Sequence, residues 1–313
     1  MNAIVLAAGL GTRMRPLSGH VPKPLLPVAG RPLLGRIIGS LAGAGCARVV
    51  VNTHHLAGRV ESFLRGIPEA GLVAVSHEPA ILGSGGALVR ARKTLAAEEF
   101  FLYHNADELT DLDVRRAVDA HLAAGSPLAT LALHDAALAS RVLVSKGDEV
   151  LGFASGRSAS RPAGSRLLAF IGVAVISREI FGLLPKEERF CSVMDALLRG
   201  MIERPGCVRA FVPGDIFWRN IEDIGGYLNV HREVLVDGAL AGVPAGPVQV
   251  CAGAEVDPGA ELAGFVSVCR GARIEAGAKL TDCVVLGGAR VGAGAAHRSA
   301  VVGDGFAIAA APA

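Results

Sequence analysis

Residues 6–17 read LAAGLGTRMRPL, and the stretch PKPLLPV follows at residues 22–28. The first stretch overlaps the end of an apolar run, Asn2–Ala8, that has the length of a buried strand. Gly9 and Gly11 let backbone N–H groups approach an anion, because no Cβ stands in the way. Arg13 adds a forked donor for phosphate oxygens, and Lys23 adds a compact positive charge. The stretch therefore predicts a phosphate-binding loop after the first strand, where open α/β sheets bind ligands.

The glycine spacing alone does not identify the ligand. A dinucleotide-binding loop has a third glycine where Met14 stands, and a P-loop requires a Gly-Lys-Ser or Gly-Lys-Thr that this stretch lacks. For this fragment by itself, an ordinary glycine turn beside a surface arginine is the alternative.

Beyond the loop, short apolar runs alternate with stretches of helical spacing as far as residue 236. The expected strands are residues 2–8, 48–53, 72–77, 100–104 and 128–133, and the expected helices are residues 32–44, 55–65, 86–95 and 113–124. This alternation predicts an α/β fold for residues 1–236, a Rossmann-like and mostly parallel sheet with helices on both faces.

From residue 237 to residue 313 the sequence changes to a hexapeptide repeat. Its aliphatic positions are Val250, Val256, Leu262, Val268, Ile274 and Leu280, and after a slip by a single position Val285 and Val291. Such hexapeptide periodicity predicts a parallel β-helix with three repeats in each coil, since a Gly/Ala linker would not keep six aliphatic residues in phase. Cys251 and Cys269 occupy equivalent positions three repeats apart, so they should lie on adjacent coils and face outward as reduced thiols.

Composition narrows the class of protein. The 313 residues carry 31 basic and 29 acidic side chains, which gives a net charge of +2. This balance does not indicate a protein that binds nucleic acid or an anionic membrane. The longest apolar run, Leu167–Ile176, is too short to span a bilayer. Arg13 and Arg15 follow the apolar start instead of preceding it, which disfavours a signal peptide. We expect a cytoplasmic protein whose six cysteines form no metal site.

The two opening stretches together resemble the signature of the sugar-1-phosphate nucleotidyltransferase family, G-x-G-T-R-x-x-P-L followed by P-K-P-L. They stand here as Gly9–Leu17 and Pro22–Leu25. The resemblance implies transfer of a nucleotidyl group from an NTP to a sugar 1-phosphate with release of pyrophosphate. It extends over the chain, because several members also carry a C-terminal left-handed β-helix. A mannose-1-phosphate guanylyltransferase-like enzyme using GTP is favoured, and a heptose or N-acetylmuramic acid 1-phosphate remains open.

The resemblance also assigns roles to residues. Arg13 and Lys23 would be the catalytic pair, with Lys23 neutralising charge on the α-phosphate. The segment at residues 78–88, EPAILGSGGAL, is similar to the family segment that packs against the nucleobase, although an ordinary helix-entry loop is the alternative. The implied nucleotide-binding set is Ala8, Gly9, Gly11, Thr12, Arg13, Glu78, Gly83 and Ser84.

Metal and sugar sites are implied in the same way. Asp107 matches the family's metal-binding aspartate, which holds Mg²⁺ between nucleotide and sugar phosphates. The alternative, a cap on the next helix, is less favoured because Asp111 and Asp113 lie nearer to that helix. Gly172 and Asn105 would contact the sugar, and a simple packing role for Gly172 is the alternative.

Two departures from the family pattern stand out. In WRNIEDIGGY at residues 218–227, Asn220 occupies the place of the second metal-binding aspartate, and a neutral amide should bind Mg²⁺ more weakly. Asp223 or Glu222 would be a substitute ligand. The family's Glu-Lys pair, which follows Gly-Phe, is replaced here by Ala154-Ser155 after Gly152-Phe153, with Arg157 as a candidate phosphate contact.

Three functional hypotheses follow. The first is an active nucleotidyltransferase, which needs no general base because the acceptor phosphate is already anionic. The second is a catalytically degenerate regulatory subunit that binds NTP or NDP-sugar, motivated by Asn220. The third, acyl transfer by the β-helix, rests on His297 alone and is disfavoured. We expect the β-helix to pack on the catalytic domain or to mediate self-association into a homo-oligomer.

Overall fold

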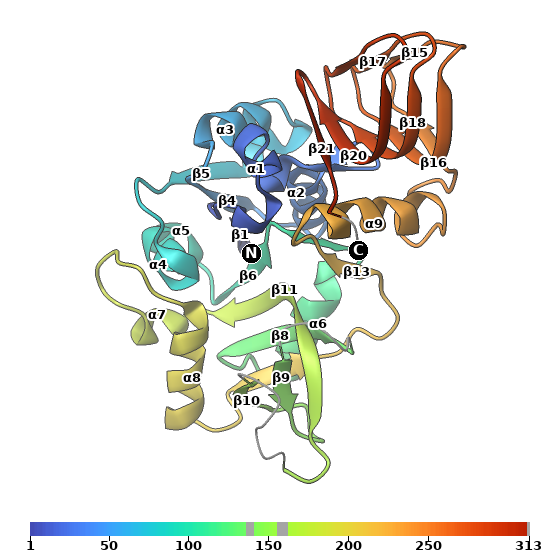
Figure 1. Cartoon of the computed structure of the whole chain (residues 1–313). Helices are drawn as coiled ribbons and strands as arrows, with labels where there is room; N and C mark the ends of the chain where they lie inside the picture. Colours follow the sequence, from blue (N-terminus) through green and yellow to red (C-terminus); the bar gives the residue numbers. More distant parts are fainter. Residues whose placement is uncertain (136–140, 155–161, 312–313) are drawn as a thin grey trace. The chain divides into compact units, whose positions relative to one another are not determined.

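The computed structural model describes residues 1–135, 141–154 and 162–311 (Figure 1). The chain divides into two compact units. Unit 1 contains Met1–Gly9, Ile37–Glu108 and Leu112–Trp218, and unit 2 contains Leu10–Arg36, Leu109–Asp111 and Arg219–Ala313. No helix in the described ranges is both long and apolar enough to cross a membrane.

Unit 1 is built on a sheet that has nine strands within the described residues. Seven of them follow the order β10-β9-β11-β6-β1-β4-β5, and β8 lies between β11 and β12. The strands are β1 (Asn2–Leu6), β4 (Arg48–Thr53), β5 (Val73–His77), β6 (Phe100–Asn105), β8 (Ala129–His134), β9 (Arg141–Val144), β10 (Val150–Ala154), β11 (Arg166–Ser177) and β12 (Val208–Phe211). Strand β1 pairs in parallel with both β4 and β6, and β4 pairs in parallel with β5.

This strand order creates a switch point beside β1. From β1 the chain continues to β4 and β5 on one side, and then returns to β6 on the other side. Leu6 and Asn105 are register partners at the carboxyl ends of β1 and β6, and the next amide, Ala106 N, donates to Leu6 O over 3.1 Å. The crevice outside such a switch point is where open α/β sheets bind ligands.

The expected α/β fold with a parallel-rich sheet is confirmed, but the sheet is mixed. Strand β11 runs antiparallel to β6, β8 and β9. Its pairing with β8 jumps from Phe170–Leu133 to Ala174–Leu131, and Gly172 lies within this irregularity. The apolar run at residues 167–176 predicted burial, but it did not predict the strand's direction, which depends on partners distant in sequence.

Helices pack on the strands of unit 1. They are α2 (Leu33–Gly43), whose first turn belongs to unit 2, α3 (Ala57–Arg65), α4 (Gly83–Arg90), α5 (Arg92–Leu95), α6 (Val114–Ala123), α7 (Ile180–Leu183) and α8 (Val193–Glu203), with the 3-10 turn η3 (Pro68–Leu72). Helix α3 contacts β4 and β5, α4 and α5 contact β1, and α6 contacts β8 and β11. The single helix expected at residues 86–95 is therefore two helices separated at Ala91.

Unit 2 joins the glycine-rich loop to the end of the chain. The loop contains η1 (Thr12–Met14), α1 (Leu17–His20), η2 (Lys23–Leu25), β2 (Pro27–Val28) and β3 (Arg31–Pro32), with a cis Arg15–Pro16 bond. Helix α9 (Ile224–Leu235) lies in the same unit. Strands β7 (Glu108–Thr110) and β13 (Trp218–Asn220) pair with each other where the chain passes between the units.

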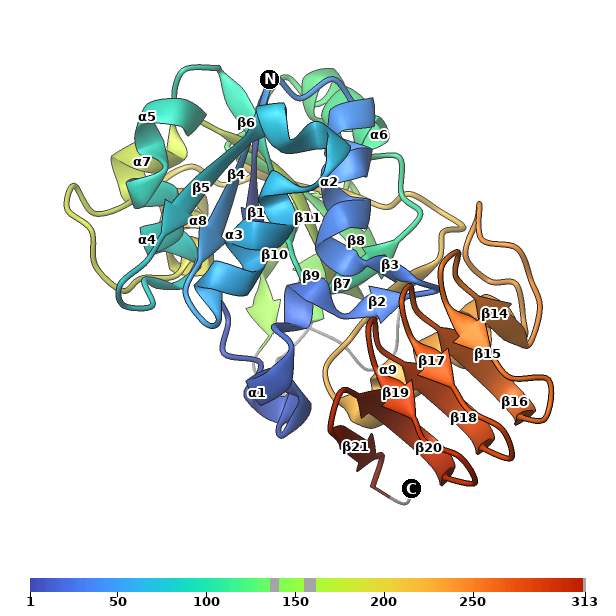
Figure 2. The ribbon, with the colours of Figure 1, turned by 90° about the horizontal axis from the view of Figure 1, so that it is seen from above.

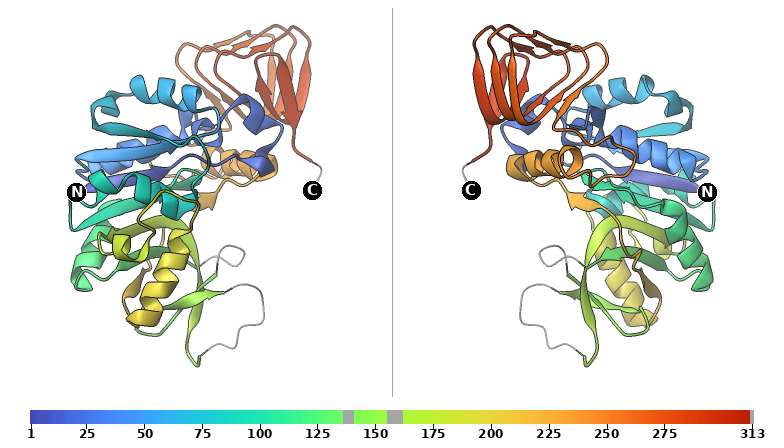
Figure 3. Two further views of the ribbon diagram at one scale, coloured as in Figure 1. Left: turned by 90° about the vertical axis from the view of Figure 1, so that its left-hand side faces the viewer. Right: turned by 90° about the vertical axis from the view of Figure 1, so that its right-hand side faces the viewer.

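The repeats form two ladders of stacked strands (Figure 2 and Figure 3). One ladder contains β14 (Val248–Val250), β16 (Glu261–Val268), β18 (Lys279–Val285), β20 (Ala296–Gly303) and β21 (Phe306–Ala309), and the other contains β15 (Glu255–Val256), β17 (Arg273–Ile274) and β19 (Arg290–Val291). We call Val248–Ala309 the stacked-strand segment. All of its pairs are parallel except β20–β21. Val250 pairs with Val268, and Val268 pairs with Val285, so the second step along the chain is shorter by the single position that the repeat loses.

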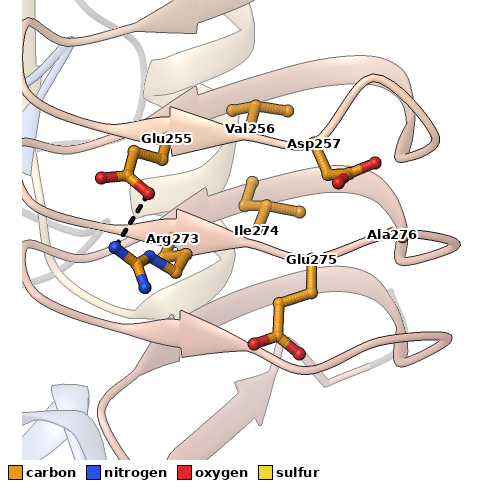
Figure 4. Close-up of a pocket in the computed structure, with 7 residues that line it drawn as sticks. All are labelled: Glu255, Val256, Asp257, Arg273, Ile274, Glu275 and Ala276. Atoms are coloured by element: carbon orange, nitrogen blue, oxygen red, sulfur yellow. Dashed lines mark ion pairs between the residues drawn. The ribbon is translucent and has the colours of Figure 1, made fainter.

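Equivalent side chains stand one above the other in these ladders. Figure 4 shows Val256 above Ile274, and Glu255 above Arg273, whose Nη2 lies 2.9 Å from Glu255 Oε2. The pocket whose lining is drawn there combines four charged residues with three apolar ones: Glu255, Asp257, Arg273 and Glu275, and Val256, Ile274 and Ala276. Cys251 and Cys269 directly follow the adjacent strands β14 and β16, whose last residues pair with each other, and both are free thiols, but Cys269 is only 4% exposed. The expected outward exposure is wrong for Cys269, because α9 packs against β16, the strand that ends at the preceding residue.

Candidate functional site

A buried hydrogen-bond network organises the carboxyl ends of β1, β4 and β5. Ala7 N donates to Asn52 Oδ1 over 2.6 Å, and Asn52 Nδ2 donates to Glu78 Oε1 over 2.8 Å. The other carboxylate oxygen of Glu78 accepts from Leu82 N over 3.0 Å. Asn52 and Glu78 are 4% and 1% exposed. The Glu78 side chain therefore fixes the loop that leads into α4, and Asn52, which the sequence analysis missed, connects it to the loop after β1.

The glycines of α4 permit a close approach of the chain at residues 189–193. Gly83 has φ +70°, and a Cβ there would lie 2.6 Å from Cys191 O. A Cβ on Gly86 would lie 2.4 Å from Arg189 O. Ser84 Oγ accepts from Val193 N over 3.0 Å at the start of α8. Packing thus accounts for these small residues, and contact with a nucleobase stays a prediction.

Asp107 lies at the switch point beside β1. It is half-buried in the turn between β6 and β7, just beyond the Leu6–Asn105 pair. The capping role considered as its alternative belongs to Asp113, whose Oδ1 accepts from Arg115 N over 3.1 Å at the start of α6. Gly9, after β1, has open space around its Cα. A carboxylate and an accessible glycine backbone therefore follow two adjacent parallel strands.

Gly172 makes room for a buried carboxylate. It has φ +76°, and a Cβ there would lie 2.4 Å from Glu108 Cγ and 3.1 Å from Asn105 Cβ. Glu108 is 3% exposed, and its Oε2 accepts from Trp218 Nε1 over 2.8 Å. Sequence reasoning missed Glu108. The feature of the sequence that could have indicated Glu108 is its position directly after Asp107.

Burial and neighbouring charges shift the pKa values of Tyr103 and His104 on β6. Burial raises the pKa of Tyr103, and the nearby carboxylates of Asp107 and Glu108 raise it further. Burial lowers the pKa of His104 to about 4, so its imidazole is neutral near pH 7. Near pH 7 Tyr103 therefore keeps its proton and His104 is neutral, so neither side chain adds a charge beside Asp107.

In unit 2, the glycine-rich loop folds back on itself. Gly11 has φ +60°, and a Cβ there would lie 3.2 Å from Ser18 Cβ and 3.6 Å from Lys23 Cβ. Arg13 has a side chain that is 65% exposed, and its Nη1 donates to Glu222 Oε2 over 2.5 Å. An exposed ion pair of this kind is weak and exchangeable, so an incoming anion would compete with Glu222 for the guanidinium.

The proposed substitute metal ligands already have partners. Asp223 is the N-cap of α9 and its Oδ1 accepts from Gly226 N over 2.7 Å, while Glu222 pairs with Arg13. Asn220 ends β13 and is half-buried. Across the described residues, no three His, Cys, Asp or Glu side chains gather in a metal-binding group. Mg²⁺ often takes only one or two protein carboxylates besides substrate phosphates, and Asp107 fits that pattern. Ser155 and Arg157 lie outside the described residues.

Comparison with known proteins identifies the domain. The nucleotidyl transferase family model matches residues 2–142, which include the loop, the Glu78 segment and Asp107. Residues 2–142 are thus similar to a nucleotidyl transferase domain. Relatives of this chain include N-acetylmuramate alpha-1-phosphate uridylyltransferase of Neisseria meningitidis, 42% identical over 36% of this chain and 49% of the relative. The chain spans about half the length of the uridylyltransferases of this name that it matches.

Two further matches extend beyond the residues that the family model covers. Mannose-1-phosphate guanylyltransferase of Mycobacterium tuberculosis is 29% identical over 94% of this chain and 82% of the relative. Among solved structures, HddC from Yersinia pseudotuberculosis, complexed with GMP-PN, matches 74% of this chain and 98% of its own chain. Its TM-score is 0.60 and its identity 22%, so this likeness supports the fold alone.

Proposed function

We propose that this chain is a sugar-1-phosphate nucleotidyltransferase, which joins an NTP and a sugar 1-phosphate to give an NDP-sugar and pyrophosphate. The observation that carries the proposal is the pairing of β1 with β6 at the switch point. The loop of the family signature leaves β1 there, and Asp107 follows β6.

The loop residues would bind and orient the phosphates. The backbone from Gly9 to Thr12 would hold the triphosphate, and Arg13 would exchange Glu222 for phosphate oxygens. Lys23 would neutralise the charge that develops on the α-phosphate. Positioning and charge stabilisation supply most of the catalysis in phosphoryl-type transfer, and the sugar phosphate attacks without prior deprotonation because it is already anionic.

By the resemblance to the family, Asp107 would hold Mg²⁺ and Asn220 would be a neutral second ligand. A bound Mg²⁺ would supply charge neutralisation between the nucleotide and the sugar phosphate. Gly172 and Asn105 would face the sugar. Glu78, Gly83 and Ser84 would serve the nucleobase through the loop backbone, since the Glu78 carboxylate is already engaged.

GTP and mannose 1-phosphate are the favoured substrates. A relative whose alignment covers 94% of this chain is named as a mannose-1-phosphate guanylyltransferase. UTP is the alternative nucleotide, because the relatives also include uridylyltransferases.

A regulatory subunit that binds NTP or NDP-sugar without turnover is the second candidate. Asn220 favours it, because an amide brings no charge to a metal. For residues 237–313 we infer a left-handed β-helix that supports a homo-oligomer, beside a nucleotidyltransferase domain of residues 1–236. The parallel ladders, in which Val250 pairs with Val268 and Val268 with Val285, support the β-helix.

The test is pyrophosphate release from GTP, UTP, ATP, CTP and dTTP, each with a panel of sugar 1-phosphates and Mg²⁺. Turnover with one pair is expected, and it names base and sugar together. Lys23→Ala should lose roughly a hundredfold or more in kcat. Lys93→Ala, at an exposed lysine of α5, is the matched control and should keep full activity. If no pair of substrates releases pyrophosphate while an NTP still binds, the regulatory candidate would be favoured.

A further inference from the structure

The hairpin β2–β3 lies directly after the 3-10 turn that carries Lys23. Pro27 pairs with Pro32 and Val28 with Arg31. Between them Ala29 and Gly30 adopt φ of 46° and 71°, as in the primed turns of tight hairpins. Only a short stretch of chain separates Lys23 from Pro27, so displacement of the hairpin would be transmitted to the Lys23 backbone.

Three successive carbonyls of this hairpin each accept a hydrogen bond from a side chain. Tyr227 Oη donates to Pro27 O over 2.5 Å, Arg36 Nη2 to Val28 O over 2.7 Å, and Gln249 Nε2 to Ala29 O over 3.2 Å. These donors come from α9, α2 and β14. The hairpin is therefore fixed by three separate elements of unit 2.

Gln249 is itself held in place by the next strand of its ladder. Ser267 is fully buried, and its Oγ donates to Gln249 Oε1 over 3.1 Å. Beside Gln249, the Cys251 thiol packs against Gly30, where a Cβ would lie within 2.2 Å of Sγ. The amide of Gln249 is thus oriented toward Ala29, and the turn carries glycine because a thiol fills the space.

The stacked-strand segment also contacts the earlier part of the loop. The ring of Phe306, on β21, stacks on the His20 ring of α1 with centroids 4.0 Å apart and an interplanar angle of 23°. The loop between Gly11 and Arg36, which includes Lys23, thus contacts the stacked-strand segment at two places. Gln249 lies near the start of that segment and Phe306 lies near its end.

We propose that Gln249 is a positioning residue for Lys23, so that the stacked-strand segment is part of the catalytic apparatus. The inference rests on the proposed function, in which Lys23 meets the α-phosphate. Gln249 acts through the Ala29 carbonyl and touches no substrate. Loss of its amide would loosen the hairpin and with it Lys23, while the other phosphate contacts stay in place.

The test is a double-mutant cycle of Gln249→Ala and Lys23→Ala in the full chain, read as kcat and KM for the NTP. Gln249→Ala should lower kcat roughly tenfold with KM changed less than about twofold, because small misplacements of a catalytic group cost rate. In the Lys23→Ala background the same substitution should cost nothing further. The milder Ser267→Ala, which removes only the bond that orients Gln249, should lower kcat less. Lys279→Ala is the control, since it breaks an exposed ion pair with Glu261 in the same segment.

The outcomes separate this inference from the proposed function. The positioning role would be overturned if Gln249→Ala lowered kcat by the same factor in the native chain and in Lys23→Ala. It would also be overturned if Gln249→Ala lowered kcat and the melting temperature together, while Lys279→Ala left the melting temperature unchanged. If the unchanged chain turns over no substrate pair, the proposed function fails, and this inference fails with it.

Discussion

Replacing Asn52 with aspartate should make the stability of this protein depend on pH. In the native chain Asn52 Nδ2 donates to Glu78 Oε1 over 2.8 Å, and both side chains are buried. Asn52→Asp keeps the oxygen that accepts from Ala7 N. It replaces the Nδ2 group that donates to Glu78 with a second carboxylate oxygen. Two carboxylates at that distance repel by about 6 kcal/mol at an effective dielectric constant of about 20.

Proton uptake limits this penalty. Holding one proton on a carboxyl group of pKa about 4 costs about 4 kcal/mol at pH 7 and about 1.4 kcal/mol at pH 5. Both costs are below the repulsion, so the folded pair keeps a shared proton and its pKa is raised. The unfolded carboxyl groups have released that proton above about pH 4. The folded state therefore binds more protons, and stability falls by about 1.4 kcal/mol for each unit that the pH rises.

The assay is urea unfolding of the native chain and the variant between pH 5 and 8, followed by the fluorescence of the single tryptophan, Trp218. Asn52→Ala should lose stability by an amount that does not change with pH. Asn52→Asp combined with Glu78→Gln exchanges the amide and the carboxylate and should recover most of the loss. Parallel stability curves for Asn52→Asp and the native chain would refute the reasoning.

Four further outcomes are expected. Asn220→Asp should lower the Mg²⁺ concentration for half-maximal turnover roughly tenfold, and an unchanged Mg²⁺ titration would remove Asn220 from the metal site. Gly172→Ala should destabilise the fold by about 2–5 kcal/mol in urea unfolding, because positive φ costs about 1–2 kcal/mol and the contact with Glu108 about 1–3 kcal/mol. Glu222→Gln should change stability by less than about 1 kcal/mol and lower KM for the NTP roughly twofold at low salt, an effect that high salt should abolish. Burial lowers the pKa of His231 to about 4, below its value of about 6.5 in the unfolded chain. The free energy of unfolding therefore decreases as the pH falls from about 6.5 to about 4. In His231→Phe this decrease should be smaller by up to about 1.4 kcal/mol per pH unit.

The sequence predicted those features that depend on local pattern. The five expected strands and three of the four expected helices are present, with bounds that differ slightly at their ends, and the helix expected at residues 86–95 is divided into α4 and α5. The ladders pair Val250 with Val268 and Val268 with Val285, in the register that the spacing of the aliphatic positions predicts, although Val250 on the first strand is 47% exposed.

Features that depend on distant partners escaped prediction. The hydrogen bonds of Glu78 with Asn52 and of Glu108 with Trp218 join side chains 26 and 110 positions apart, and no periodicity marks such pairs. The hexad pattern assigned Cys269 to an outward position but carried no information about α9, which covers it. The roles of Arg13, Lys23 and Asp107 stay predictions, because they concern bound substrates.

The shared unit of the loop and the stacked strands has a consequence for how the protein is made. Lys23 and Ala29 leave the ribosome long before Gln249 and Phe306 do. Nascent chains fold progressively from the N-terminus, but this loop acquires its last contacts only when β14 and β21 have emerged. A chain whose translation stops early would thus contain the whole family signature and still have an unfinished loop.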